Sequence, residues 1–139
     1  MPFNEFKEIY RKVPRLCVDI IVKTEEGIVL AKRDIPPAKG MWHIPGGTVL
    51  MDETNEEAVK RVAKEELGLQ VEIDRLLGVI EYFKEFAFGQ STGIVYLVRI
   101  TGGNLRGSKD AEEVGFFKTI PENTIPEQVK FLREQLMIK

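Results

Sequence analysis

The sequence predicts one mixed α/β domain, spanning residues 1–139, in which a β-sheet is sandwiched between helices. Three observations carry this prediction: a pair of strand-like runs within 16–33, an amphipathic helix at 54–67, and a second helix that closes the chain from about residue 126. Strands at the start with helices in the middle and at the end favour a mixed sandwich over a doubly wound parallel sheet. With 139 residues, 43% of them hydrophobic, the chain is long enough to bury one core.

The charge balance and the single cysteine narrow the function classes. The chain has 20 Lys and Arg against 22 Asp and Glu, a formal net charge of −2, which argues against nucleic-acid or membrane binding driven by bulk charge. Cys17 is the only cysteine, so an intramolecular disulfide is excluded and an inert buried thiol is expected. A reducing, cytoplasmic setting fits this composition, as does the lack of an apolar run of membrane-spanning length or of a signal-peptide core.

The first part of the chain predicts a helix followed by a hairpin. Apolar residues at helical spacing favour a short amphipathic helix within residues 1–13, which Pro14 ends. The runs LCVDIIVK and IVLAKR favour two strands joined by a glycine-containing turn at 24–27. Asp19 interrupts the first strand. Because side chains alternate along a strand, Asp19 lies on the face opposite Val18 and needs a polar partner or a cleft.

The middle of the chain predicts a helix behind a glycine turn. A proline-rich loop precedes a short strand at 42–44 and a turn at the double glycine 46–47. Thr54 and Glu57 form a capping box, an apolar stripe follows at helical spacing, and Gly68 is a suitable C-terminal stop.

The rest of the sequence predicts the second half of the sheet and the closing helix. It is strand-rich at 71–83 and 92–100, polar and loop-like at 102–110, strand-like at 114–118, and helical from about residue 126. These elements complete the mixed sandwich.

The stretch from Gly46 to Leu69 concentrates acidic side chains around the middle helix. Its spaced positions are Gly47, Glu53, Arg61, Glu65, Glu66, Gly68 and Leu69. They match the Nudix box, Gly-x5-Glu-x7-Arg-Glu-U-x-Glu-Glu-x-Gly-U with U aliphatic, which would arise by chance in roughly one frame in ten million. The chain therefore resembles the Nudix hydrolases, and the resemblance implies a mixed sheet packed between helices, with the box as a loop-helix-loop.

The box also predicts a metal site. Glu65 and Glu66 reach the same end of the helix, and two such close carboxylates repel each other unless a cation lies between them. A hard cation such as Mg²⁺, or alternatively Mn²⁺, satisfies both, and the Gly47 carbonyl can approach the same point. Nudix hydrolases similarly hold a metal over a diphosphate. Most Glu-Glu pairs are solvated surface residues, but the glycine turn and the spacing favour the metal. Glu53 and Arg61 are expected to form an ion pair that fastens the loop to the helix.

Val62 departs from the box. In many Nudix enzymes this position is a glutamate that binds metal or acts as the general base, and valine can do neither. The site then holds fewer metal ions, takes its base from elsewhere, or has lost activity. Asp110, Glu112 and Glu113 follow a glycine-containing loop and are together the candidate catalytic acids; for each one singly, a solvated acidic turn is the alternative.

Outside the box, residues 14–19, the pair Lys32-Arg33 and the segment 37–47 resemble the GDP-mannose mannosyl hydrolase family, which also lacks the Arg-Glu glutamate. This resemblance implies that Arg33 contacts a diphosphate, that Asp19 contacts sugar or base, and that water attacks the sugar carbon. Two positions differ: Thr48 replaces an arginine, and the late loop lacks that family's glutamine and histidine. A pyrophosphohydrolase that attacks phosphorus, acting on a nucleoside triphosphate or an ADP-ribose-like diphosphate, is equally compatible.

The expected function is therefore Mg²⁺-dependent hydrolysis of a nucleoside diphosphate linked to another group, with a small-molecule nucleotide as partner. The alternative is a non-catalytic nucleotide-binding domain, which Val62 keeps open. The apolar N-terminal helix and the resemblance favour a homodimer.

His43 is expected beside the site rather than as a catalyst. Four aromatic residues either stack on a base or belong to the core, namely Trp42, Tyr82, Phe86 and Phe88.

Overall fold

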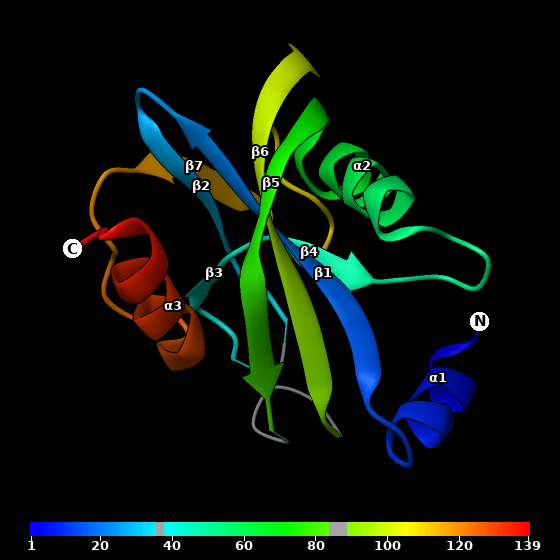
Figure 1. The fold of residues 1–139 in the computed structure, drawn as a ribbon. Helices are drawn as coiled ribbons and strands as arrows, with labels where there is room; N and C mark the ends of the chain where they lie inside the picture. The colour runs from blue at the N-terminus through cyan, green and yellow to red at the C-terminus, as the bar shows by residue number, and fades with distance from the viewer. Residues whose placement is uncertain (36–37, 84–88) are drawn as a thin grey trace.

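The computed structural model describes residues 1–35, 38–83 and 89–139 (Figure 1). Its strands are β1 Arg15–Thr24, β2 Gly27–Lys32, β3 Trp42–His43, β4 Gly46–Thr48, β5 Leu69–Tyr82, β6 Ser91–Gly103 and β7 Glu113–Phe117. Its helices are α1 Phe3–Tyr10, α2 Asn55–Leu67 and α3 Pro126–Leu136. The strands form one seven-stranded sheet with the order β3-β2-β1-β6-β5, in which β4 pairs with β1 and β7 pairs with β2.

The sheet is mixed, as predicted, and β1 lies at its centre. β1 runs parallel to β6 and antiparallel to β2 and β4. Asp19 is opposite Val95 of β6 and opposite Gly46 of β4. Because both neighbours approach it closely, the carboxyl of this aspartate is enclosed in the middle of the fold.

Helices cover the two faces of the sheet, which confirms the predicted sandwich. α2 packs on the face that carries Val18, Ile20 and Val22 of β1. α3 packs through Phe131 on the opposite face, which carries Ile21. Figure 1 shows α2 and α3 on either side of the central strands. The alternation of side chains along β1 thus divides the core into two halves.

Local signals define α2 as predicted. The Thr54 hydroxyl accepts a hydrogen bond from the Glu57 N–H at 3.1 Å, and the Glu57 carboxylate accepts one from the Thr54 N–H at 3.0 Å. Gly68 ends the helix at φ 68°, a conformation that glycine adopts at little cost. The cap and the stop place the acidic end of α2 beside β4.

The double glycine departs from its predicted turn. Gly46 and Gly47 belong to the extended strand β4, which pairs with β1. Glycine is needed here for close approach: a Cβ on Gly46 would lie 2.5 Å from Asp19 Oδ1, and one on Gly47 would lie 2.9 Å from Val62 Cγ2. The interpretation as a turn was wrong because pairing with a strand distant in sequence overrides the local turn preference of glycine.

The N-terminal helix is present but shorter than the predicted 1–13, because α1 ends at Tyr10. It lies beside the start of β1 (Figure 1). None of its residues is buried. No helix in the described parts of the chain is both long and apolar enough to span a membrane.

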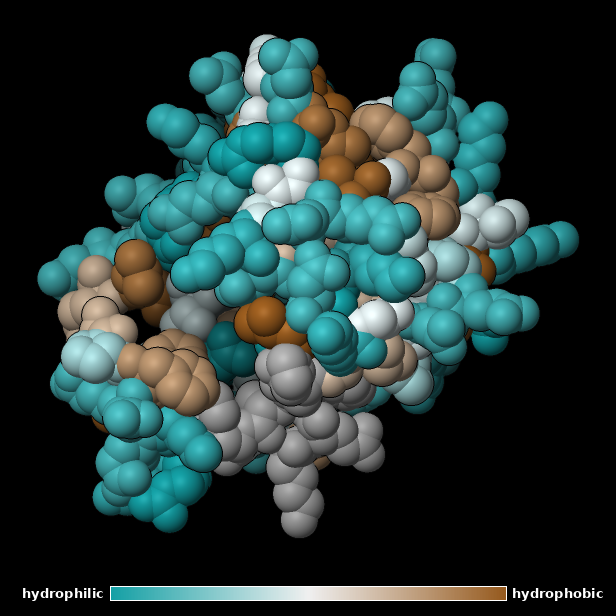
Figure 2. Space-filling model, turned by 180° about the vertical axis from the view of Figure 1, so that it is seen from behind, coloured by the Kyte–Doolittle hydropathy of each residue, from teal (hydrophilic) through white to brown (hydrophobic). Residues whose placement is uncertain are grey.

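Exposed hydrophobic side chains occur near α1 and along the edge strand β5. Phe3 and Val13 are exposed around α1, and Leu76 and Val79 are exposed on β5. On the face shown in Figure 2, hydrophobic residues form separate groups between hydrophilic ones. A homodimer through the α1 surface stays a prediction.

Candidate active site

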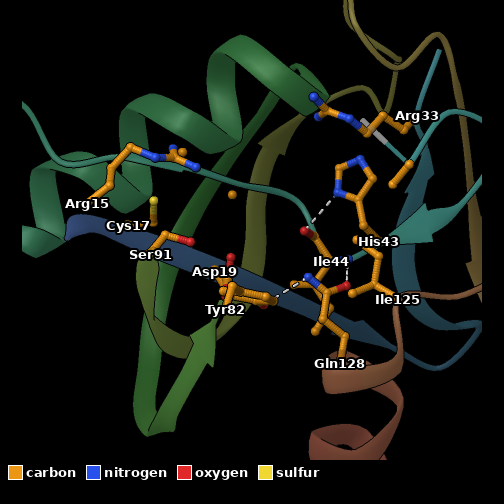
Figure 3. Close-up of a pocket in the computed structure, with 13 residues that line it drawn as sticks. Arg15, Cys17, Asp19, Arg33, His43, Ile44, Tyr82, Ser91, Ile125 and Gln128 are labelled. Atoms are coloured by element: carbon orange, nitrogen blue, oxygen red, sulfur yellow. Dashed lines mark hydrogen bonds between the residues drawn. The ribbon is translucent and has the colours of Figure 1, made fainter. Parts of the chain in front are cut away.

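A pocket of about 190 Å³ opens where β1, β3, β4, β5 and α3 meet. Its polar lining consists of Arg15, Cys17, Asp19, Arg33, His43, Tyr82, Ser91 and Gln128 (Figure 3). The backbone of Gly46 and Gly47 forms part of the wall. Burial raises the pKa of Cys17 to about 11, so its thiol stays protonated at neutral pH, in keeping with the predicted inert thiol.

A chain of hydrogen bonds orients Asp19 at the floor of the pocket. The Ile44 N–H donates to Gln128 Oε1 at 2.6 Å, which turns the Gln128 amide nitrogen toward Tyr82. That nitrogen donates to the Tyr82 hydroxyl at 3.0 Å, and the hydroxyl donates to Asp19 Oδ2 at 2.9 Å. The backbone donor sets the direction of the whole chain, so Asp19 always receives a hydrogen bond from Tyr82.

Burial controls the ionisation of Asp19. Its side chain is buried between Gly46 and Gly93, where any Cβ would collide with the carboxyl oxygens. This burial raises the pKa of Asp19 to about 7, against the opposing effects of the Tyr82 hydrogen bond and the charge of Arg15. Near neutral pH the carboxyl is therefore partly protonated. It can accept a hydrogen bond from a hydroxyl or N–H of a ligand, and its protonated form can also donate one.

Arg33 follows β2 and reaches the pocket from the side of the late loop (Figure 3). Burial lowers its pKa, while the negative charges of Asp110 and Glu66 raise it. Three predicted site residues therefore act on one another electrostatically, one each from the end of β2, the end of α2 and the late loop. A cation beside two acidic groups suits a phosphate that is shared with a metal ion.

The ion pair expected between Glu53 and Arg61 is present. Arg61 Nε lies 2.7 Å from Glu53 Oε2, and Arg61 Nη2 donates to Glu53 Oε1 at 3.1 Å and to the Thr48 carbonyl at 2.8 Å. Arg61 Nη1 also lies 3.2 Å from Glu65 Oε2. One guanidinium therefore connects the loop, β4 and the acidic end of α2 without entering the pocket.

Glu66 is held by the late loop. The Ser108 hydroxyl donates to Glu66 Oε2 at 2.8 Å, and no motif in the sequence had indicated this serine. Val62, one turn earlier, is buried and faces Gly47. Position 62 thus contributes to packing beneath β4 and supplies no ligand.

A small donor set remains for a divalent ion. Among the residues that the structure describes, no three His, Cys, Asp or Glu side chains come close enough to hold a metal. Mg²⁺ is often held by one or two carboxylates and completes its octahedron with water and substrate phosphates. Glu66, the exposed Glu65 and the carbonyl of Gly47 supply only oxygen donors, the chemistry that such a smaller set requires.

The three acidic residues of the late loop have different environments. The Glu112 N–H donates to Asp34 Oδ2 at 2.8 Å. Glu113 begins β7 and forms an exposed ion pair with Lys32 at 3.9 Å. Asp110 is the residue of the three whose charge raises the pKa of Arg33. Of the three, Asp110 is therefore the acid whose charge acts on a residue that lines the pocket.

Comparisons with known proteins agree with this geometry. The NUDIX domain family matches residues 13–136. The chain belongs to this family. A structural relative is the MutT NUDIX hydrolase from Burkholderia pseudomallei, with a TM-score of 0.81 and 29% identity over 90% of this chain and 99% of that one. The predicted Nudix resemblance is confirmed, while the finer resemblance to GDP-mannose mannosyl hydrolases stays a prediction.

Two curated relatives are similar over part of their length. The low-salt glycan biosynthesis protein Agl8 of Haloferax volcanii is 43% identical over 83 residues, which are 60% of this NUDIX chain and 53% of that protein. The ADP-ribose pyrophosphatase of Methanocaldococcus jannaschii is 40% identical over 104 residues, which are 75% of this chain and 62% of that protein. The chain therefore matches about half of the length of one relative and about three-fifths of the length of the other.

The tautomer of His43 in this NUDIX domain follows from its one hydrogen bond. His43 Nδ1 lies 3.0 Å from the Ile44 carbonyl, which can only accept, so Nδ1 carries the proton. Nε2 is buried without a partner among the described residues. Burial, the largest cause, and the charge of Arg33 lower the pKa of His43 below 6.5.

We therefore expect His43 to remain neutral, with its proton on Nδ1, as pH falls through 6.5. Because the chain has one histidine, long-range ¹H-¹⁵N correlation spectra will report this ring without ambiguity. A titration midpoint at or above 6.5, or a proton on Nε2, would contradict the arrangement.

The four aromatic residues considered for stacking on a base differ in their surroundings. Trp42 packs edge-on against Phe117 with ring centroids 4.8 Å apart and is a partly buried residue at the edge of the core. Tyr82 lines the pocket and holds Asp19. Phe86 and Phe88 lie outside the described residues.

Sequence reasoning missed the roles of Arg15 and Gln128. Both reach the pocket from elements that the linear sequence does not connect to the box. Gln128 is buried although it is polar and lies in the amphipathic helix α3. A polar residue at a core-facing helical position was the only available signal.

Proposed function

We propose that this NUDIX domain is a divalent-metal-dependent hydrolase that cleaves a nucleoside diphosphate linked to another group, either a nucleotide sugar or an ADP-ribose-like molecule. The observation that carries the proposal is a pocket lined by the predicted phosphate-binding Arg33 and the buried Asp19. The charges of Asp110 and Glu66 act on Arg33 and raise its pKa. The name of one relative, an ADP-ribose pyrophosphatase, supports the same substrate class.

Each predicted residue has a role in this proposal. Glu65, Glu66 and the Gly47 carbonyl would hold Mg²⁺, with Mn²⁺ as an alternative; the ion would supply Lewis-acid chemistry and a water of lowered pKa. Arg33 binds a phosphate through charge-assisted hydrogen bonds. Asp110, whose charge acts on Arg33, accepts the proton of the attacking water, with Glu112 and Glu113 as the other candidates for this role.

Asp19 would recognise the part of the substrate that enters the pocket. Its carboxyl is oriented by Tyr82 and is surrounded by glycines, so it can bond a hydroxyl of a sugar or an N–H of a base without rearrangement. This is the contact that distinguishes sugar-linked or base-linked diphosphates from inorganic diphosphate.

A second candidate is a NUDIX domain that binds a nucleotide without hydrolysing it. The burial of Val62 against Gly47 favours this alternative, because the chain lacks a carboxylate at that position. The exposure of hydrophobic residues around α1 also supports a homodimer in either case.

The test is a panel of nucleotide sugars, ADP-ribose and nucleoside triphosphates, each incubated with Mg²⁺ or Mn²⁺. We expect turnover of at least one diphosphate-linked substrate, abolished by a chelator. Tight binding of one compound without any turnover would overturn the enzyme proposal in favour of the binding domain.

Hydrolysis in ¹⁸O-labelled water identifies the atom that is attacked. Label in the phosphate product indicates attack at phosphorus, and label in the free sugar indicates attack at carbon. Attack at carbon would support the mannosyl hydrolase resemblance, whereas attack at phosphorus would support the pyrophosphohydrolase alternative.

A further inference from the structure

We propose that Arg15 forms a second anion subsite of the pocket, facing Arg33 from the other side, and binds a phosphate of the substrate there. This inference rests on the proposed function, because it assigns the substrate phosphates to two opposed arginines.

Two elements hold the Arg15 guanidinium at the pocket. Arg15 Nη1 donates to the Thr48 hydroxyl of β4 at 2.9 Å. Arg15 Cζ lies 5.7 Å from the centroid of the Phe6 ring of α1, within the range of a cation–π contact. The Thr48 carbonyl is itself held by Arg61 at 2.8 Å. The box therefore orients Arg15 indirectly, through the strand that also carries Gly47.

The charge of Arg15 is only partly compensated. In the described parts of the chain, Arg11, Arg61 and Arg99 each form an ion pair, whereas Arg15 forms none. Asp19 lines the same pocket, but its buried carboxyl is partly neutral near pH 7 because its pKa is raised to about 7. A guanidinium with this little compensation attracts an anion.

The two arginines of the pocket also repel each other. The pKa of Arg33 is lowered mainly by burial, and the charge of Arg15 lowers it further. Figure 3 shows Arg15 and Arg33 approaching from opposite sides, with Asp19 between them. A polyanion that contacts both guanidiniums removes this repulsion.

The free donors of Arg15 define the ligand class. A guanidinium has five N–H donors in a planar fork that matches phosphate oxygens, and Thr48 takes one of them. A ligand with one phosphate satisfies one of the two arginines, while a ligand with two or more satisfies both. The subsite thus selects nucleoside diphosphates and their derivatives over nucleoside monophosphates.

Calorimetric titration with AMP and with α,β-methylene-ADP, a diphosphate that resists hydrolysis, tests the subsite. We expect the wild type to prefer the diphosphate. Arg15→Gln should weaken diphosphate binding by about 10- to 100-fold, the usual range for a charge-assisted hydrogen bond, and weaken AMP binding much less. Arg15→Lys should retain part of the preference, because it keeps the charge but loses the fork.

Arg11→Gln is the matched control. Arg11 is an exposed arginine four residues earlier that is paired with Glu8 at 2.8 Å, so its replacement should leave both affinities unchanged. Phe6→Leu removes the ring but keeps an apolar side chain, and should weaken diphosphate binding less than Arg15→Gln. Circular dichroism and melting temperatures establish that each variant is folded.

The outcomes separate this inference from the proposed function. If Arg15→Gln binds both nucleotides like the wild type, the subsite is wrong, even if the enzyme turns over a substrate with its usual KM. If no substrate is hydrolysed but Arg15→Gln loses the preference for the diphosphate, the subsite stands and the hydrolase proposal fails.

Discussion

Replacing Glu66 by glutamine should reduce Mg²⁺-dependent turnover by at least about a hundredfold, because a neutral amide is a poor ligand for a hard cation. Glutamine has almost the same shape and keeps an oxygen that can accept the Ser108 hydrogen bond. The late loop should therefore stay in place and the melting temperature of the metal-free protein should change little. Steady-state kcat and KM at several Mg²⁺ concentrations measure the effect.

Glu56→Gln provides the matched control on the same helix. Glu56 lies in the first turn of α2, is exposed, and pairs with Lys60 at 3.5 Å, so its neutralisation should leave turnover unchanged. Near-normal activity and an unaltered Mg²⁺ dependence of the Glu66→Gln variant would refute the assignment of Glu66 as a metal ligand.

Replacing Asp19 by asparagine should stabilise the protein at alkaline pH. The pKa of Asp19 is raised from 3.8 to about 7 by burial, so the folded state holds a proton that the unfolded state releases as pH rises above 3.8. The stability that this bound proton contributes to the folded state is fully present below pH 3.8, the pKa of the unfolded state. It is lost as pH rises through about 7, the pKa of the folded state. Asparagine imitates the protonated carboxyl and avoids this loss, a difference of about 2–4 kcal/mol.

Urea unfolding near pH 4 and near pH 8 measures this difference. The two proteins should have similar free energies of unfolding at the lower pH, and the variant should be more stable at the higher one. Asp52→Asn is the control: Asp52 is exposed at φ 66°, a conformation that asparagine tolerates, so its profile should follow the wild type. An Asp19→Asn variant that is less stable than the wild type near pH 8 would contradict a buried carboxyl whose pKa is raised.

Elements with a local cause were predictable from the sequence. The capping box of Thr54 and Glu57 and the glycine stop at Gly68 define α2, because each of these contacts joins residues that are close along the chain. The alternation of side chains in β1 likewise predicted that Asp19 and Val18 face opposite sides of the sheet. The spacing of the box then placed Arg61 within reach of Glu53.

Contacts between distant segments were not predictable. The double glycine has the local character of a turn, but pairing with β1 and the proximity of Val62 and Asp19 make it a strand. The hydrogen bonds around Tyr82 join residues 63 and 46 positions apart, and no periodicity relates Asp19, Tyr82 and Gln128. The same applies to Ser108, which contacts Glu66 only because the late loop folds back on α2.

By itself the sequence determined the family, the order of helices and strands, and the acidic residues that a metal would require, since these depend on spacing along one helix and on alternation along single strands. Only the tertiary structure decided which charges share the pocket: it placed Arg15 opposite Arg33 and isolated Asp19 between two glycines. The physical reason is that burial and electrostatic interaction depend on distance in space, and in this chain the groups that surround the pocket come from both ends of the sequence.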